Sequence, residues 1–371
     1  MKKVAIITLH RVRNYGSSLQ TLALQDKIKS LGFKVEVIDY YPERYTSFGL
    51  LKRLKNKSEK LRRNPVLLFG ARVIISISYL RKKLVFDRFL KDNINLTTKT
   101  YKSENDLFES PVAADAFCTG SDQVWNSLWN EGVDSPFYLS FVDKNKYKFS
   151  YAASIGNSAV KKDEGDIVKE YLASYNHLSV REDNGVDILK KLGFEDVVQV
   201  LDPTLLIDAT GWERYTSNKY EGQKYVVTYN LHHDSRIDQY ANEVAKKFNL
   251  KVYHISYNWH DIYRKGELKW CPKIEDYLSL IKNAQYVITD SFHATVFSLI
   301  FHTDFVVIYP EQASSRLRSI LRQTNLETRG TEEMPKVELV SNKISFDDID
   351  ERLRLLRQDS FSYLDKVLGE I

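Results

Sequence analysis

At 371 residues, with 43% hydrophobic and 28% charged residues, the chain has the composition of a soluble globular protein and is long enough for two domains. Its net charge of +5, from 54 basic and 49 acidic residues, is too small to indicate nucleic-acid binding. Cys118 and Cys271 are the two cysteines, which excludes a disulfide framework and a cysteine metal site, so a reducing cytoplasm is expected.

The first 40 residues are predicted to form a strand, a helix and a second strand. Residues 2–9 favour a buried strand, residues 18–31 carry apolar side chains at helical spacing, and residues 33–38 are a second short apolar run. This order indicates a parallel sheet with a right-handed crossover. The apolar run at the N-terminus is too short for the core of a signal peptide, so we interpret it as a strand.

The loop after the first strand, residues 10–18, is predicted to line a cleft, because ligands bind beyond the carboxyl ends of parallel strands. Its arginines would supply positive charge, and its glycine would let the backbone approach a ligand. The loop has neither a dinucleotide-binding glycine fingerprint nor a Walker motif, and a plain polar turn would give the same residues. The candidate site residues are Arg11, Arg13, Asn14, Tyr15, Gly16 and Ser17.

Residues 41 to about 110 break the alternation of strands and helices, so they are predicted to be a helical insertion. Residues 52–63 hold seven basic residues and one acid, and the apolar run 66–80 follows. That run is too short to span a bilayer and contains Arg72. Two interpretations stay open: a solvated basic helix packed on an ordinary core helix, or an interfacial patch that rests on anionic lipid headgroups.

The strand predicted at residues 113–118 ends in a loop rich in hydrogen-bonding side chains. A carboxylate, amides and one exposed indole are what sugar hydroxyls and sugar ring faces require. A turn capped by an aspartate, with its tryptophan in the core, would give the same sequence. The candidate sugar-binding residues are Gly120, Ser121, Asp122, Gln123, Trp125 and Asn126.

Arg181 ends a strand predicted at residues 177–181, after another at 147–154. At that position its planar fork could bind a carboxylate or phosphate, or it could form a salt bridge with Glu182 or Asp183. A further strand, residues 197–201, leads into Asp202-Pro-Thr204, and the proline favours a domain boundary. The first domain is therefore predicted to cover residues 1–206.

The second half repeats the alternation, and a second domain is predicted over residues 207–345. The strand at 225–231 ends in His232-His-Asp234, and the strand at 251–255 is followed by Trp259; both His232 and Trp259 are expected near the acceptor side of the cleft. Adjacent histidines diverge in direction, so no metal site is predicted. The last helix, residues 346–371, is expected to pack back on the first domain.

The strand predicted at residues 286–289 leads directly into Asp290-Ser-Phe-His293 and an apolar helix. Backbone N–H groups and the helix dipole favour an anion at such a junction. His293, in the first helical turn, could touch both the anion and the group that reacts with it, although a packed histidine beside a helix cap would fit as well. Arg316, in the first turn of the next helix, would be a further anion contact.

Taken together, two sheet-and-helix domains facing across a cleft resemble the glycosyltransferase-B-like architecture. Five ordered motifs are more specific and resemble those of the polysaccharide pyruvyl transferase family over roughly residues 4–325. They are Asn14-Tyr-Gly-Ser-Ser-Leu-Gln20, Gly120-Ser-Asp-Gln-Val-Trp-Asn126, Ser179-Val-Arg-Glu182, Asp202-Pro-Thr204 and Thr289-Asp-Ser-Phe-His-Ala-Thr-Val-Phe-Ser298.

Members of that family transfer the enolpyruvyl unit of phosphoenolpyruvate to two hydroxyls of a sugar, which forms a cyclic ketal and releases phosphate. The resemblance implies phosphoenolpyruvate as co-substrate, no other cofactor, and a sugar acceptor of the galactose type. His293 matches the family's catalytic histidine, and Arg181 matches a donor-binding arginine. Better-known members carry an arginine where this chain has Ser291, so the missing charge must come from Arg316, Arg11 or Arg13.

In the expected mechanism His293 is a general acid that protonates the methylene carbon of the enol while a sugar hydroxyl attacks the adjacent carbon. Because a helix N-terminus disfavours a charged imidazole, the donor's anions and Asp290 are expected to offset that effect. Ser291 and Phe292 are expected to contact the donor beside it.

Two other functions stay open: a glycosyltransferase that uses a sugar nucleotide in the same cleft, and a carbohydrate-binding protein without catalysis. The acceptor of a pyruvyl transferase of this kind is expected to be linked to a lipid diphosphate. The protein would then work in the cytoplasm at the inner face of the membrane, where its basic cluster could meet anionic lipid.

Overall fold

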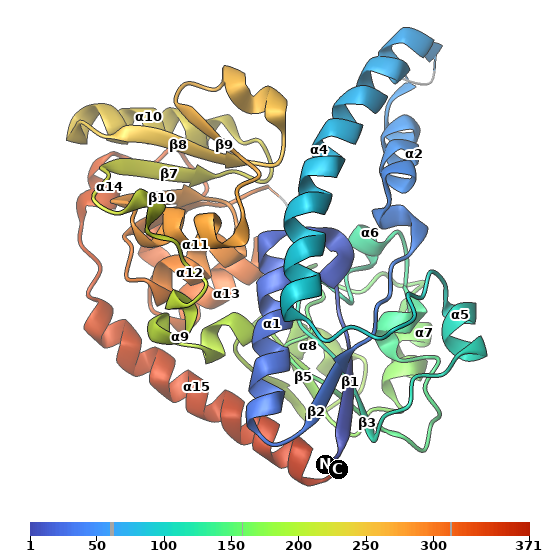
Figure 1. Ribbon diagram of the computed structural model, residues 1–371. Coiled ribbons are helices and arrows are strands. Elements are labelled where there is room, and N and C mark those ends of the chain that lie inside the picture. The colour runs from blue at the N-terminus through green and yellow to red at the C-terminus, as the bar shows by residue number, and fades with distance from the viewer. Residues whose placement is uncertain (60–62, 158, 312–313) are drawn as a thin grey trace.

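The computed structural model describes residues 1–59, 63–157, 159–311 and 314–371. Its first lobe is built on a parallel sheet with the strand order β2-β1-β3-β4, extended through isolated bridges by the parallel pair β5-β6 (Figure 1). These strands are β1 (Lys3–Ile7), β2 (Lys34–Val37), β3 (Ala116–Thr119), β4 (Tyr147–Ser150), β5 (Leu178–Val180) and β6 (Val197–Gln199).

The second lobe is built on a six-stranded parallel sheet with the order β12-β11-β10-β7-β8-β9. The strands are β7 (Tyr225–Tyr229), β8 (Lys251–Ser256), β9 (Glu267–Trp270), β10 (Tyr286–Thr289), β11 (Phe305–Ile308) and β12 (Gly330–Thr331). The alternating pattern predicted β7, β8 and β10, but not β9 and β12. These two strands lie at the edges of the sheet, and β12 is only two residues long.

Both faces of each sheet are buried, because successive residues of a strand point to opposite faces. In β1, Val4 and Ile6 belong to one hydrophobic core, whereas Ala5 and Ile7 belong to another. The helices that cover these faces are α1 (Tyr15–Ser30), α7 (Gly165–Leu172), α8 (Asp183–Lys191), α10 (Ser235–Phe248), α11 (Ile274–Lys282), α12 (Phe292–Ile300) and α13 (Ser315–Gln323).

Short helices occupy many of the connections. The α-helical ones are α5 (Glu104–Glu109), α6 (Ser127–Asn130), α9 (Ala209–Glu213) and α14 (Glu338–Ser341). The 3-10 turns are η1 (His10–Val12), η2 (Glu43–Tyr45), η3 (Ser135–Tyr138), η4 (Pro203–Leu206), η5 (Asn218–Tyr220), η6 (Trp259–Tyr263) and η7 (Glu327–Arg329).

Two helices between β2 and β3 form a projection from the first lobe. They are α2 (Ser47–Lys57) and α4 (Pro65–Asn93), which pack against each other. The N-terminal end of α4 lies away from both sheets in Figure 1. Of the predicted basic cluster, residues 60–62 lie outside the described residues. In the described part of the chain, no helix is long and apolar enough to cross a membrane.

Tyr15 joins the two lobes through an aromatic cluster. Its ring stacks on Tyr277 with centroids 4.0 Å apart, and its hydroxyl donates to the carbonyl of Pro272 at 2.7 Å. Its backbone N–H donates to the hydroxyl of Tyr257. The prediction that Tyr15 lines the cleft is therefore wrong: the side chain is fully buried between the lobes, where its hydroxyl has a carbonyl partner.

The last helix, α15 (Phe346–Gly369), runs from the second lobe back along the first (Figure 1). Near the start of α15, Asp350 contacts His302, which belongs to the second lobe. Further along, Tyr363 donates to the carbonyl of Ser150 at the end of β4, and Ser360 accepts from the backbone of Leu201. One helix therefore holds both lobes.

Candidate active site

The loops that carry the predicted site residues meet between the two sheets. In each sheet the strands are parallel, so their carboxyl ends share one edge. The loops after β1, β3, β5 and β6 bring Ser17, Asp122, Arg181 and Asp202 into one cluster, and the loop after β10 adds His293 from the second lobe. The sequence is folded so that residues nearly 280 positions apart form one site.

Asp202 is the centre of this cluster and is fully buried. One carboxylate oxygen accepts from Arg181 Nη1 at 2.7 Å and from Ser121 Oγ at 3.1 Å. The other accepts from the backbone and hydroxyl of Thr204. His293 Nε2 lies 3.7 Å from the first oxygen, which places a carboxylate directly beside the predicted catalytic imidazole.

Asp202 was not predicted as a site residue, because the proline after it indicated a domain boundary. Burial by itself raises the pKa of the Asp202 carboxyl, but His293, Arg181 and Thr204 more than offset burial and hold the pKa well below its usual range. The group is therefore ionised at neutral pH. The signal that could have found it is its place directly after a strand that ends at the same edge as Arg181.

The variant Asp202→Asn is expected to lower the free energy of unfolding by about 3–5 kcal/mol at pH 7, since it leaves Arg181 buried without its charge partner. A carboxyl whose pKa is lowered by folding contributes stability above its unfolded value of about 3.9, and that contribution is lost as the pH falls below it. The difference in unfolding temperature between the parent and Asp202→Asn is therefore expected to be large at neutral pH and to decrease below about pH 4.

A matched control is Asp163→Asn, at an exposed position. A difference in unfolding temperature that stays the same down to acid pH would show that the carboxylate charge of Asp202 does not stabilise the fold.

His293 is held by the start of α12. Ser291 caps this helix by accepting from the backbone of Ala294, and the imidazole lies in the first turn, nearly buried. Its Nε2 makes no hydrogen bond to the residues that the structure describes. The prediction of a histidine in the first helical turn is confirmed, and this nitrogen keeps its hydrogen-bonding capacity unused.

Gly16 lies against this imidazole from the other lobe. A Cβ built on Gly16 would lie 1.9 Å from His293 Nδ1, far inside contact distance. The glycine predicted to let the backbone approach a ligand in fact lets α1 approach the histidine. The first turn of α1, capped by Asn14 through Gly16 N–H, thereby fixes the imidazole on the side away from Asp202.

The variant Gly16→Ala is expected to lower turnover by at least about 100-fold, because the methyl group must displace the imidazole and a shift of about 1 Å in a reacting group has an effect of that size. Steady-state kinetics and thermal unfolding would be measured together. Gly165→Ala is the control, since its Cβ would meet only ordinary contacts. Turnover in Gly16→Ala equal to that of the control would contradict the close approach.

Arg181 is nearly fully buried under the face of Phe292, whose ring centroid lies 4.3 Å from the guanidinium carbon. Asp122 and Glu182 lie 3.7 and 3.8 Å from its nitrogens, besides the bond to Asp202. Among the described residues its Nε and Nη2 have these ion pairs but no hydrogen bond. The alternative of a salt bridge to Glu182 is thus present, and two nitrogens of the fork keep an unused hydrogen bond.

Arg316, in the first turn of α13, is the second arginine of the site. Its Nε is buried and makes no hydrogen bond to a described residue. Burial, and next the neighbouring Arg181, lower the pKa of Arg316 to about 10, against the raising effect of Asp122, Glu182 and Asp202. It remains charged at neutral pH, so two arginines from opposite lobes converge on one place.

Arg11 and Arg13 point elsewhere. Arg11 makes two hydrogen bonds to Asp39, and Arg13 makes two to Asp87 at the base of α4. His10 adds a third bond to Asp39. The prediction that these arginines bind the donor is not supported, because both forks are occupied by carboxylates that are distant in sequence.

Asp290 supports a loop and does not support His293. Its two oxygens accept from the backbone N–H groups of Leu231 and His232 at 2.7 and 2.9 Å, and the His232 ring contacts the same carboxylate. The charge predicted to assist His293 comes from Asp202 instead. His232 remains half-exposed beside this loop, and Trp259 is half-buried in η6 with no partner for its indole N–H.

The loop after β3 divides into two parts. Asp122 accepts from Ser17 Oγ and faces Arg181, as a site residue should. Trp125, predicted as an exposed indole for sugar, is instead in the core: it is buried, stacks on Tyr138 and donates to the carbonyl of Phe137. The prediction of an exposed tryptophan that binds sugar is wrong, because the indole N–H donates to a carbonyl inside the lobe.

The remaining residues of this loop shape its backbone. Gly120 packs tightly against Thr8, where a side chain would crowd β1 and α1. Asn126 caps α6 and donates to the side chain of Gln123. Among the described residues, no group of three histidines, cysteines or carboxylates could hold a metal ion.

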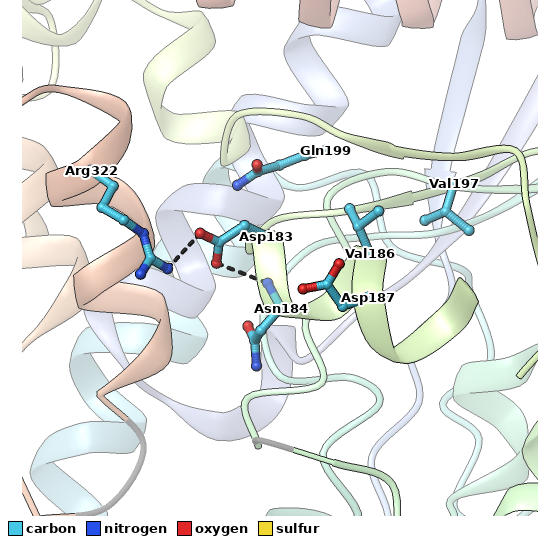
Figure 2. Close-up of a pocket in the computed structure, with 7 residues that line it drawn as sticks. All are labelled: Asp183, Asn184, Val186, Asp187, Val197, Gln199 and Arg322. Atoms are coloured by element: carbon cyan, nitrogen blue, oxygen red, sulfur yellow. Dashed lines mark hydrogen bonds and ion pairs between the residues drawn. The ribbon is translucent and has the colours of Figure 1, made fainter. Parts of the chain in front are cut away.

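A surface pocket of about 500 Å³ lies where α8 and α13 meet (Figure 2). Arg322 points from α13 to Asp183 at the start of α8, and Gln199 lies above them. His293, Arg181 and Arg316 do not line it. This pocket therefore lies at the junction of the lobes and is distinct from the cluster around Asp202.

The model of the polysaccharide pyruvyl transferase family matches residues 14–312. The chain belongs to this family. As a polysaccharide pyruvyl transferase family member it is a transferase, and the matched range contains His293, Arg181 and Asp202, while Arg316 lies just beyond it. None of the curated proteins matches the chain.

Solved structures with low sequence identity share the fold of this family member. A putative UDP-N-acetylglucosamine 2-epimerase from Listeria monocytogenes is 10% identical with a TM-score of 0.55, over 96% of this chain and 90% of that chain. The Methanocaldococcus jannaschii UDP-GlcNAc 2-epimerase in complex with UDP-GlcNAc and UDP is 11% identical with a TM-score of 0.51, over 95% and 92%. MurG from Acinetobacter baumannii is 9% identical with a TM-score of 0.50, over both whole chains. The predicted glycosyltransferase-B-like fold is confirmed.

Proposed function

We propose that this protein transfers the enolpyruvyl unit of phosphoenolpyruvate to two hydroxyls of a sugar in a polysaccharide repeat unit, and so forms a cyclic pyruvate ketal. The observation that carries the proposal is a set of buried nitrogen atoms that make no hydrogen bond to any described residue: Arg181 Nε and Nη2, Arg316 Nε and His293 Nε2. Buried polar groups in proteins are nearly always paired, so these four call for a ligand rich in acceptor oxygens. A molecule with a phosphate and a carboxylate is such a ligand.

The carboxylates of Asp122, Glu182 and Asp202 balance the positive charges of the cluster. The cluster would therefore not bind an anion through net charge alone. Glu182 Oε1 accepts from two backbone N–H groups and the hydroxyl of Ser154, whereas its Oε2 accepts no hydrogen bond from the described residues and lies 3.8 Å from Arg181 Nε. Such an oxygen could accept a hydrogen bond from a hydroxyl group. The site therefore matches a reaction in which an anionic donor and a sugar hydroxyl meet.

In the proposed reaction the two arginines hold the donor's anions, and His293 donates a proton to the methylene carbon. A sugar hydroxyl forms a bond to the adjacent carbon, phosphate leaves that carbon, and the second hydroxyl closes the ketal. One hydroxyl proton ends on the new methyl group by way of His293, and the other leaves with phosphate. The ionised carboxylate of Asp202 would balance the positive charge of a protonated His293 side chain before the donor binds.

The acceptor is proposed to be a galactose-type sugar on a lipid diphosphate carrier, so the protein would act in the cytoplasm at the inner face of the membrane. The experiment that tests the function is release of inorganic phosphate from phosphoenolpyruvate. Release should require a galactose-containing acceptor, and the product should gain the mass of a pyruvate ketal. Phosphate release without an acceptor, or none with any sugar, would contradict the proposal.

One alternative uses the same donors, since Arg181 and Arg316 could also hold the diphosphate of a sugar nucleotide. That reaction would release a nucleotide and would not consume phosphoenolpyruvate. A carbohydrate-binding protein without catalysis would release neither. Parallel assays with both donors therefore separate the three functions.

A further inference from the structure

The segment that contains α2 and most of α4 holds the excess of positive charge of the chain. From Thr46 to Phe86 the sequence has eleven basic residues and one acid, Glu59, for a net charge of +10. The full chain has a net charge of +5, so the rest of the sequence has a net charge of −5. Helix α2 and the first part of α4 stand away from the two sheets (Figure 1), whereas Arg81 and Lys82 contact the second lobe.

The same projection exposes apolar side chains that a protein in water normally buries. Along α4, Val66 is 78% exposed, Phe69 is 69% and Leu84 is 69%. Leu67, Val73, Ile74, Ile77 and Leu80 are exposed as well. On α2, Phe48 adds to them. Continuous apolar surface of this kind, edged by polar residues, marks a binding face.

The exposed residues follow one face of a straight helix. They are spaced by three or four residues, and five helical turns of 3.6 residues separate the first from the last, so the line does not drift around the helix. Arg72 and Lys83 are exposed along its edge. An apolar stripe bordered by cations is the pattern of a helix that lies in a membrane interface. The residues of this α4 stripe are Val66, Phe69, Val73, Ile77, Leu80 and Leu84.

We propose that the α4 stripe and the basic residues around it dock the protein on an anionic lipid bilayer. The apolar side chains enter the boundary between headgroups and acyl chains, and the cations meet lipid phosphates. This inference extends the proposed function, since a lipid-linked acceptor is reached only beside a membrane. It names the surface of this chain that makes the contact.

A second copy of the chain is a poorer occupant of the same face. A coiled coil would need a repeat of seven, and the frame that keeps Val73, Ile77, Leu80 and Leu84 in the seam would place Gly70 there in place of Phe69. Two copies would also oppose segments that each carry a net charge of +10. Anionic lipid satisfies both the charge and the straight apolar face.

The lower part of α4 connects this face to the cleft. Arg13, next to the first turn of α1, is bonded to Asp87, and Lys82 lies 4.1 Å above the ring of Tyr257 in the second lobe. Arg81 donates to the carbonyl of Cys271. Because α1 also fixes His293 through Gly16, docking through α4 would hold the site at a set orientation to the bilayer.

The test is co-sedimentation of the full chain with vesicles of phosphatidylcholine alone or mixed with phosphatidylglycerol, without donor or acceptor. Binding is expected to the mixed vesicles at about 0.1 M salt and to weaken at about 1 M, where screening shortens the Debye length to about 3 Å. The variant Val66→Gln, Phe69→Gln, Val73→Gln should bind about 100-fold more weakly. Its control is Phe108→Gln, Ile167→Gln, Ile262→Gln, which removes exposed apolar side chains elsewhere and should bind normally.

A second variant, Lys55→Gln, Arg72→Gln, Lys83→Gln, should also lose about 100-fold, at about fivefold for each charge. Lys144→Gln, Lys146→Gln, Lys162→Gln is its matched control on exposed lysines outside the projection. In Phe69→Trp the indole emission should shift to the blue on binding, and in Ile262→Trp it should not.

Failure of the parent chain to bind mixed vesicles at low salt would overturn the inference. So would normal binding by the stripe variant, or a dimer in sedimentation velocity that this variant dissolves. Vesicle binding is measured without turnover, whereas the proposed function is tested with a soluble sugar acceptor. Failure of one therefore leaves the other result standing.

Discussion

Replacing His293 by glutamine is expected to lower turnover by about 10²- to 10⁴-fold while the fold and the donor affinity stay nearly unchanged. Glutamine has a similar length and keeps a hydrogen-bond donor, but it cannot transfer a proton to carbon. The imidazole lies against Gly16, and its Nε2 is 3.7 Å from the Asp202 oxygen that also accepts from Arg181. Turnover would be followed by phosphate release and donor affinity by calorimetry.

His232→Gln is the matched control, because that histidine is half-exposed and bonded to Asp290. The control should keep most of its turnover. A His293→Gln enzyme with near-normal turnover would remove the imidazole from the chemistry, and the same loss in both variants would point to the loops and not to proton transfer.

Replacing Arg181 by lysine is expected to weaken donor binding by about 10- to 100-fold, although the positive charge is kept. Lysine can still pair with Asp202, but it cannot present two further N–H groups in a plane. A hydrogen bond to a charged group contributes about 1.5–3 kcal/mol, which corresponds to this loss. Arg181→Ala should bind as poorly and should also unfold more easily, since it leaves Asp202 buried without a partner.

Calorimetric titration with phosphoenolpyruvate and thermal unfolding of each variant are the measurements. Arg11→Lys is the control: it changes another paired arginine, whose partner Asp39 is outside the cluster. Full recovery of donor affinity in Arg181→Lys would show that the site needs only a charge there.

The fold could be predicted largely from local patterns. Strand β10 was expected at residues 286–289 and α12 directly after it, and both are present. Parallel strands with helical crossovers leave few arrangements of their carboxyl ends, so His293 and Arg181 could each be placed at the carboxyl edge of its own sheet from sequence alone.

The partners of each side chain could not be predicted. Arg13 looks like a free cation in a polar loop until α4 brings Asp87 beside it. Trp125 looks exposed among polar neighbours until Phe137 offers its carbonyl. Such pairings depend on contacts between distant segments, which leave no periodic signal in the sequence.

The absent family arginine shows the same limit. Three arginines could have replaced the charge missing at Ser291, and the sequence did not distinguish them. Geometry does: Arg11 and Arg13 are bound to carboxylates, whereas Arg316 lies near Arg181 with a free Nε. We expect donor preference in this chain to depend on Arg316.

The path of α15 has a consequence for synthesis of the chain. Strand β4 and the segment after β6 are made early, yet their partners Tyr363 and Ser360 lie in the last helix. While the ribosome makes the second lobe, this side of the first lobe is without its cover. The second lobe can pair its strands once β12 has left the ribosomal tunnel. The first lobe, although it is translated first, can complete its cover only after the last helix has been made.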